Sequence, residues 1–286
     1  MLSHECDIYQ LLHLVMPGVS LSLHHLMDMD HYYPESQPMY DIGTQVERAL
    51  ALQSESGGSL KTFVAFDPSR ADGLAVVEEA LAKGCVGVKF YPPNGYRPLG
   101  NGDPVDERNR KLFDLCQGGK IPLFTHCTPA GFESMPGYGR LSDPVAWRLV
   151  MKEFPTLRLC LGHAGGAADW TSGDELGPYA RTVIDLCESY EQVYCEFGHF
   201  EEILEDDSVF VARLAEAIDG GPPPGGYSLA DKIMFGSDWH IMAMFESEPG
   251  SYRRAFETAF ANPSLAPYSD GFFASNAEAY LGTAAP

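Results

Sequence analysis

Seven short, mostly apolar segments recur along the chain, each bounded by glycine, proline or polar residues. They lie at about 19–28, 61–66, 86–91, 121–126, 157–162, 193–198 and 231–237. Short apolar runs of this kind are typical of strands that are buried on both faces, as in a parallel sheet. Periodic segments between them predict helices, so the pattern indicates a parallel α/β fold.

The helices are predicted from apolar spacing and from their boundary residues. Residues 3–15 carry apolar side chains at i, i+3, i+4 and i+7 from Ile8 to Val15. Asp72 is expected to cap the helix at 73–83 and Gly84 to end it. Acidic caps are also expected at two later helices, which follow Asp103-Pro104 and Asp143-Pro144. Further helices are expected at 41–54, 73–83, 179–189, 202–218, 252–260 and 276–281.

Three of the predicted strands end in a side chain that can bind a metal ion: His126, His163 and Asp238. Their spacing is regular. His126 follows Lys89, in the predicted strand at 86–91, by 37 residues, and His163 follows His126 by 37 residues. Asp238 follows His163 by 75 residues, which is close to two such steps. One strand, one helix and two loops take up about that length. Repeated units would bring these residues to the carboxyl ends of a barrel's strands, where such barrels keep their chemistry.

Composition narrows the class of protein. A length of 286 residues with 45% hydrophobic residues suits a single barrel domain spanning 1–286. The net charge of −21 and the lack of a basic stripe argue against nucleic acid and anionic membrane as partners. Seven cysteines without a CxxC pair predict reduced thiols in a cytoplasmic protein, and no apolar run reaches the length of a membrane span.

Five phrases follow one another along the chain: Gly87-Val88-Lys89, Thr125-His126-Cys127, Gly162-His163-Ala164-Gly165-Gly166, Phe235-Gly236-Ser237-Asp238-Trp239 and Ser275-Asn276-Ala277. Together they resemble the amidohydrolase superfamily, most closely the amidohydrolase-related group that includes the aminocarboxymuconate semialdehyde decarboxylase-like enzymes. The likeness runs from about Val19 to Leu281. It implies a (β/α)8 TIM-like barrel that holds one divalent metal, zinc or else manganese, at the carboxyl ends of its strands.

The resemblance also implies roles for single residues. His126 corresponds to the family's fifth-strand metal ligand, and Asp238 to the eighth-strand Asp that binds metal and handles the proton of water. His163 corresponds to the sixth-strand His, which is a metal ligand or a general acid/base. Lys89 falls where some relatives carry a bridging modified lysine, but as a strand-end lysine it is expected simply to pair with Asp28 or Asp30.

The sequence departs from the family at its beginning. The family's first strand ends in a His-x-His pair, whereas this chain has the adjacent His24-His25, which we expect to precede the strand end and to face opposite sides. Only seven strands are counted where a closed barrel needs eight. The expected fold is therefore a TIM-like barrel without its first strand, and metal binding is expected to be weak. The helix at 3–15 fits the family's first helix, which favours a missing strand encoded upstream of Met1.

Other side chains near the strand ends leave alternatives open. Tyr96 and Arg97 either contact a substrate carboxylate or are solvated loop residues. His31, His199 and His240 either line the pocket or belong to loops. No GxGxxG or Gly-x-Ser-x-Gly motif occurs at a suitable junction, which argues against a nucleotide-binding protein or a serine hydrolase.

The resulting hypothesis is a metal-dependent hydrolase of C–N or C–O bonds, or a decarboxylase, acting on a small cyclic or aromatic carboxylic acid derivative. In the hydrolytic version Asp238 takes a proton from water and His163 stabilises the oxyanion. The alternative is a catalytically inactive, N-terminally shortened barrel that acts as a binding or scaffold protein. Strand edges left open by a missing strand would favour a homo-oligomer.

Overall fold

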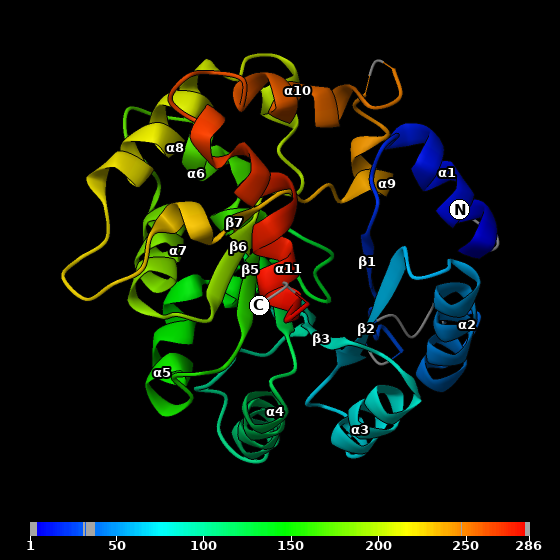
Figure 1. The fold of residues 1–286 in the computed structure, drawn as a ribbon. Helices are drawn as coiled ribbons and strands as arrows, with labels where there is room; N and C mark the ends of the chain where they lie inside the picture. Colours follow the sequence, from blue (N-terminus) through cyan, green and yellow to red (C-terminus); the bar gives the residue numbers. More distant parts are fainter. Residues whose placement is uncertain (1–4, 31, 33–37, 247, 284–286) are drawn as a thin grey trace.

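In the computed structural model, which describes residues 5–30, 32, 38–246 and 248–283, seven parallel strands form one curled sheet (Figure 1). Their order in the sheet is their order in the chain, from β1 to β7. The sheet is therefore an open TIM-like barrel. The strands are β1 (Ser22–His25), β2 (Leu60–Phe66), β3 (Gly87–Phe90), β4 (Leu123–His126), β5 (Leu159–Gly162), β6 (Val193–Glu196) and β7 (Ile233–Met234).

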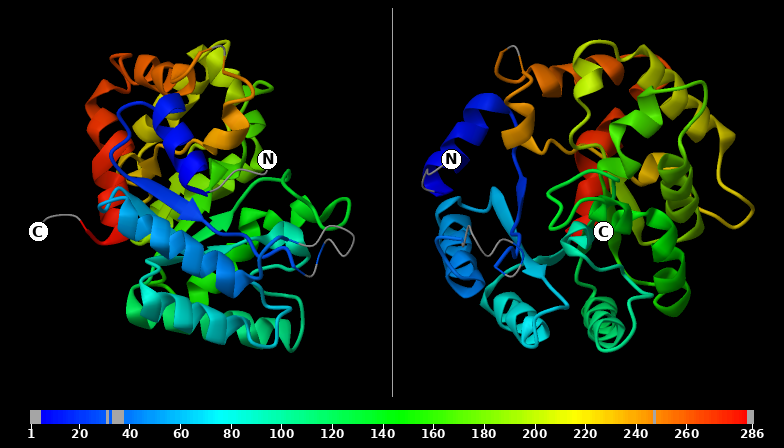
Figure 2. Two further views of the ribbon diagram at one scale, coloured as in Figure 1. Left: turned by 90° about the vertical axis from the view of Figure 1, so that its right-hand side faces the viewer. Right: turned by 180° about the vertical axis from the view of Figure 1, so that it is seen from behind.

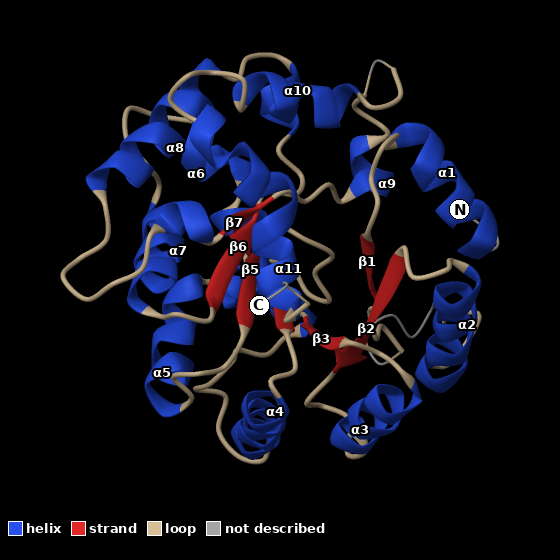
Figure 3. Cartoon of the chain, viewed as in Figure 1, coloured by secondary structure: helices blue, strands red, loops and turns tan. Residues whose placement is uncertain are grey.

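Helices surround the outside of the curled sheet (Figure 3). Strands in such a barrel are buried on both faces, which is why β3, β4, β5 and β6 contain only buried residues. The helices are α1 (Glu5–Val15), α2 (Ile42–Glu55), α3 (Gly73–Lys83), α4 (Val105–Gly119), α5 (Trp147–Glu153), α6 (Ala167–Thr171), α7 (Pro178–Ser189), α8 (Ser208–Gly220), α9 (Trp239–Met242), α10 (Ser251–Ala259) and α11 (Asn276–Leu281).

Glycines on the strands make room for large groups inside the barrel. A Cβ on Gly87 would come within 2.3 Å of the Phe63 ring, and one on Gly162 within 2.4 Å of the Phe124 ring. The interior is thus filled by alternating large and small residues from neighbouring strands. This packing fixes the register, because a shift of one residue would exchange the two faces.

The C-terminal helix α11 lies at the end of the sheet where the strands begin, and not in the outer ring (Figure 2, left). Its Tyr280 is fully buried, with its ring 5.6 Å from that of Tyr194 on β6 and 6.4 Å from that of Phe63 on β2. Both residues belong to an apolar cluster inside the barrel. Helix α11 therefore closes the barrel's amino-terminal end.

Residues just before and within α11 also cover the outer edge of β7. The buried Asn276 side chain donates from Nδ2 to the carbonyls of Ala230 and Ile233, each at 2.8 Å, and the N–H of Phe235 donates to Phe272 O at 2.8 Å. Among the residues that the structure describes, none covers the edge of β1 by such hydrogen bonds. The N–H groups of Ser22 and Leu26 donate to Ser59 O, just before β2, and to Phe63 O within it. Those of Leu23 and His25 therefore face the open side.

The strands and the fold class are confirmed, with strands other than β2 shorter than predicted and four corrections. His24 and His25 are the last two residues of β1 and do not precede its end. Asp72 makes no side-chain cap bond. Helix α4 begins at Val105 with Pro104 in the cap position, so Asp103 is not its cap. The predicted helix at 202–218 divides into a short 3₁₀ turn, Glu201–Leu204, and α8.

Six cysteines lie buried among the apolar side chains and are free thiols: Cys85, Cys116, Cys127, Cys160, Cys187 and Cys195. Burial disfavours the thiolate, raising the pKa of Cys116 to about 12. In the part of the chain that the structure describes, no helix combines the length and the apolar character needed to cross a membrane.

Candidate functional site

His126 and His163 meet at the carboxyl ends of β4 and β5. Their ring centroids are 4.8 Å apart, edge to face. His126 Nε2 lies 2.6 Å from Ala130 O, and His163 Nδ1 lies 3.0 Å from Gly198 O. Burial, with the charges of His163 and Lys89, lowers the pKa of His126. Because Gly198 O accepts from Nδ1 of His163, its Nε2 is the nitrogen left for a ligand.

Asp238 follows β7 and is surrounded by histidines. Its Oδ2 lies 3.7 Å from His199 Nδ1, and its Oδ1 lies 3.9 Å from His240 Nδ1. Burial alone would raise the pKa of Asp238, but the hydrogen bond of His199 and the charge of His163 outweigh it, so the pKa is lowered. The same contact with Asp238 raises the pKa of His199. Asp238 is therefore an ionised carboxylate at neutral pH.

Several backbone positions at this end of the barrel are left-handed although they are not glycines. His163 has φ 62°, His199 has φ 59° and Asp238 has φ 49°. Such a residue costs about 1–3 kcal/mol and persists where its surroundings hold it, commonly at functional sites. The three follow β5, β6 and β7 in turn, so the strain is concentrated where the candidate residues gather.

Glu196, at the end of β6, is a site residue that the sequence reasoning missed. Its Oε1 accepts a hydrogen bond from the backbone N–H of His163 at 2.9 Å and lies 3.9 Å from His163 Nδ1. A Cβ on Gly236 would come within 1.4 Å of Glu196 Oε2, so a glycine there is required. The signal was present as one carboxylate inside an otherwise uncharged strand, two residues from Tyr194 and hence on the same, inward face.

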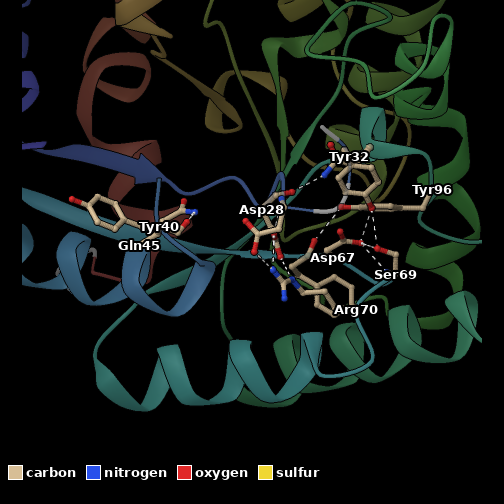
Figure 4. Close-up of polar contacts among 11 residues, drawn as sticks. Asp28, Tyr32, Tyr40, Gln45, Asp67, Ser69, Arg70 and Tyr96 are labelled. Carbon is tan, nitrogen blue, oxygen red and sulfur yellow. Dashed lines mark hydrogen bonds and ion pairs between the residues drawn. The ribbon is translucent and has the colours of Figure 1, made fainter. Parts of the chain in front are cut away.

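Lys89 does not pair with Asp28 or Asp30, contrary to the expectation. Arg70 from the loop after β2 binds both carboxylates. Figure 4 shows Arg70 beside Asp28. Its Nη2 also lies 3.2 Å from Asp28 Oδ1, so the guanidinium grips Asp28 with two nitrogens. A guanidinium presents several donors in a fixed plane and suits such multiple contacts better than an ammonium does.

Lys89 is instead buried inside the barrel among aromatic rings. It is 6% exposed, and its Nζ lies 4.3 Å from the centroid of Phe124 and 5.8 Å from that of Tyr91. Burial lowers the pKa of Lys89 to about 8, although the charges of Asp238 and Glu196 act in the opposite direction. Lys89 is thus a cation held at a cost in free energy.

His25 is the other inward residue that the sequence reasoning set aside. Its ring lies 4.1 Å from that of Phe124 and 4.9 Å from that of Phe63, and its Nε2 is buried without a hydrogen-bond partner. Burial, followed by the charge of Lys89, lowers its pKa. Of the adjacent pair His24 and His25, only His25 points to the inner side of the sheet, as expected from the alternation of side chains along a strand.

The remaining candidates lie further from this cluster. Tyr96 is buried, with its hydroxyl donating to Phe66 O at 3.0 Å, while Arg97 is exposed. His31 lies outside the described residues. A cavity of about 400 Å³ opens at the same face between the loops after β1 to β4, lined by Tyr32, Pro68, Ser69, Asn94, Gly95, Tyr96, Val105, Ser134, Met135 and Tyr138.

The three expected metal ligands do not form a three-ligand site in this arrangement. His126 Nε2 contacts a backbone carbonyl, and the Asp238 oxygens face His199 and His240. Among the described residues, no three His, Cys, Asp or Glu side chains come together in a way that could hold a metal ion. Binding of zinc or manganese by His126, His163 and Asp238 therefore stays a prediction.

Known structures share this fold. The chain is similar to 5-carboxyvanillate decarboxylase from Sphingomonas paucimobilis, at 15% identity over 93% of this chain and 79% of that one, with a TM-score of 0.59. It is also similar to 2,6-dihydroxybenzoate decarboxylase from Rhizobium, at 17% identity over 98% and 89% of the two chains, with a TM-score of 0.57.

A third structure of this fold is an amidohydrolase from Burkholderia multivorans with bound zinc, at 12% identity over 98% and 88%, with a TM-score of 0.62. A search of curated proteins found no match. A family model described as amidohydrolase matches residues 41–266, most of the chain. That match, on a curled parallel sheet with its polar residues at the strand ends, shows that this chain belongs to the amidohydrolase family.

Proposed function

We propose that this chain is a hydrolase of C–N or C–O bonds, or a decarboxylase, acting on a small cyclic or aromatic carboxylic acid derivative. The observation that carries the proposal is the gathering of strained, charged residues after β5, β6 and β7, where barrels of this class keep their active sites. Two structural relatives are decarboxylases of aromatic acids, which supports the substrate class.

In the hydrolytic version, Asp238 accepts a proton from the attacking water and His163 stabilises the charge that develops on the substrate oxygen. Asp238 is suited to this role because it is ionised and largely buried, and His199 beside it can share the proton. His163 offers Nε2, since its Nδ1 is held by Gly198 O and its backbone by Glu196. If His126, His163 and Asp238 held a divalent metal, it would supply a lower pKa for a bound water.

The test is turnover of a panel of aromatic and cyclic carboxylic acids and their lactones and amides, followed by chromatography and CO₂ release. Asp238→Asn should lower kcat by about 10²–10⁴-fold on any substrate found. Asp185→Asn is the matched control, because Asp185 pairs with Arg148 on the surface. Full activity of the Asp238→Asn variant would contradict the assignment.

Elemental analysis of the same preparations tests the metal. We expect weak binding of zinc or manganese, lost in His126→Ala and Asp238→Ala and removed by a chelator. The absence of a three-ligand cluster among the described residues favours the second candidate, a binding barrel without catalysis. Saturable binding of panel compounds without turnover, at any added metal concentration, would support that candidate.

A further inference from the structure

Lys89 is a buried cation with no ionic partner in the part of the chain that the structure describes. It is the last residue but one of β3, near the carboxyl end of that strand, and is 6% exposed. Its Nζ lies over the faces of Phe124 and Tyr91. Aromatic faces attract an ammonium, but they offset only part of the cost of removing it from water.

The carboxylates that could neutralise Lys89 are engaged elsewhere. Asp28 and Asp30 bind Arg70. Glu196 accepts the backbone N–H of His163, and Asp238 lies between His199 and His240. Each of these carboxylates is held by its own neighbours, so none is free to move to Lys89 without breaking an existing contact.

The rings next to Lys89 suggest the shape of the missing anion. Phe124 has Lys89 over its face and His25 beside it, with ring centroids 4.1 Å apart. Tyr91 continues the aromatic surface towards His126, at a ring distance of 4.9 Å. A flat ligand that carries an anionic group matches a surface of rings with one ammonium among them.

We propose that Lys89 is the binding residue for the carboxylate of a planar aromatic or cyclic acid, whose ring packs on the Phe124 and Tyr91 side chains. The ion pair forms inside the barrel, where low polarity strengthens it. That this acid is the substrate rests on the proposed function, but the binding itself does not require turnover. Among the described residues the ammonium has no ionic partner, and the ligand supplies one.

The probes are benzoate and its neutral analogue benzamide, titrated into the full chain by NMR and calorimetry. Benzoate should bind at least tenfold more tightly than benzamide. Lys89→Met, which keeps the length and apolar stem of the side chain, should weaken benzoate at least tenfold and leave benzamide unchanged. Lys111→Met is the matched control, because Lys111 pairs with Glu107 on the surface of α4 and should have no effect.

Thermal melting separates this role from a structural one, since Lys89→Met should fold and melt at or above the wild-type temperature once the buried charge is removed. Equal binding of benzoate to the wild-type and Lys89→Met chains would overturn the proposal, as would equal binding of benzoate and benzamide to the wild-type chain. Carboxylate-dependent binding without turnover of any acid would uphold the proposal while the proposed function failed.

Discussion

At the scale of single residues, Arg70 and Lys89 show how the chain assigns two of its cations to different tasks. Arg70 fastens the loops after β1 and β2 by gripping Asp28 and Asp30, whereas Lys89 stands alone among rings. The planar guanidinium satisfies several acceptors at once, and an ammonium loses its charge more readily when buried. Arg70 therefore binds Asp28 and Asp30, the carboxylates that were predicted to pair with Lys89. Side-chain geometry decides this pairing, and the spacing of residues in the sequence does not show it.

The lowered pKa of Lys89 makes folding stability depend on pH. Between about pH 8 and its ordinary value of 10.5, Lys89 is neutral in the folded chain and charged in the unfolded one. The unfolded chain then binds more protons, so stability rises with pH in that window. Lys89→Met should be more stable than wild type by up to about 3 kcal/mol at pH 7, and the difference should shrink towards pH 10.5.

Urea denaturation of both chains at several pH values measures this difference, and comparing the two chains cancels the titration of other groups. Lys111→Met serves again as the reference, because its ammonium is exposed and paired. A difference that stays constant from pH 7 to pH 10 would show that Lys89 keeps its ordinary pKa in the folded chain.

At the scale of elements, the C-terminal segment finishes the sheet on one side. Asn276 satisfies two carbonyls beside β7, and Phe272 O accepts the N–H that follows this strand. An edge strand normally presents such groups to solvent or to another chain. The Ser275-Asn276-Ala277 phrase, which contributed to the family resemblance, thus has a structural role at the sheet edge.

Asn276→Asp tests this role, because it keeps the size of the side chain but removes both donors. Two lost hydrogen bonds should lower the free energy of unfolding by about 2 kcal/mol, and a carboxylate facing two carbonyls should lower it further. Asn262→Asp is the control, since Asn262 is exposed and uses its Oδ1 as an acceptor, which aspartate retains. Urea unfolding curves of equal midpoint for the two variants would contradict the stabilising role of Asn276 at the edge of β7.

At the scale of the whole molecule, the two ends of the sheet differ. The β7 edge is covered, while Leu23 and His25 direct backbone groups to the open side of β1. An uncovered edge invites pairing with another chain. The net charge of −21 opposes association through long-range repulsion, which salt screens.

We therefore expect the chain to self-associate, more strongly at high salt than at low salt. Sedimentation velocity over a range of protein and salt concentrations measures this. Lys61→Glu is a useful comparison on the neighbouring β2, because it increases the negative charge near β1 without altering the open edge. A single monomeric species under every condition would refute the expectation.

The order and type of the main elements, and the strand ends that carry His126, His163 and Asp238, were accessible from the sequence. Apolar runs separated by amphipathic segments can be buried in few ways, and parallel strands bring their carboxyl ends to one face. The pattern could not reveal Glu196 as the holder of His163, because that contact joins the ends of two separate strands. It also misplaced His24 and His25, whose strand is only four residues long.

The sequence by itself determined the parallel barrel and the face on which its polar residues lie, since burial periodicity and chain direction are local properties. Only the tertiary structure decided which charges are paired. Arg70, from the loop after β2, binds Asp28 and Asp30 after the neighbouring β1, which leaves Lys89 without an ionic partner among the described residues. Asp238 lies near His199, from the loop after β6, and near His240. Such pairings depend on distances between residues far apart in the chain, which packing fixes and sequence order does not.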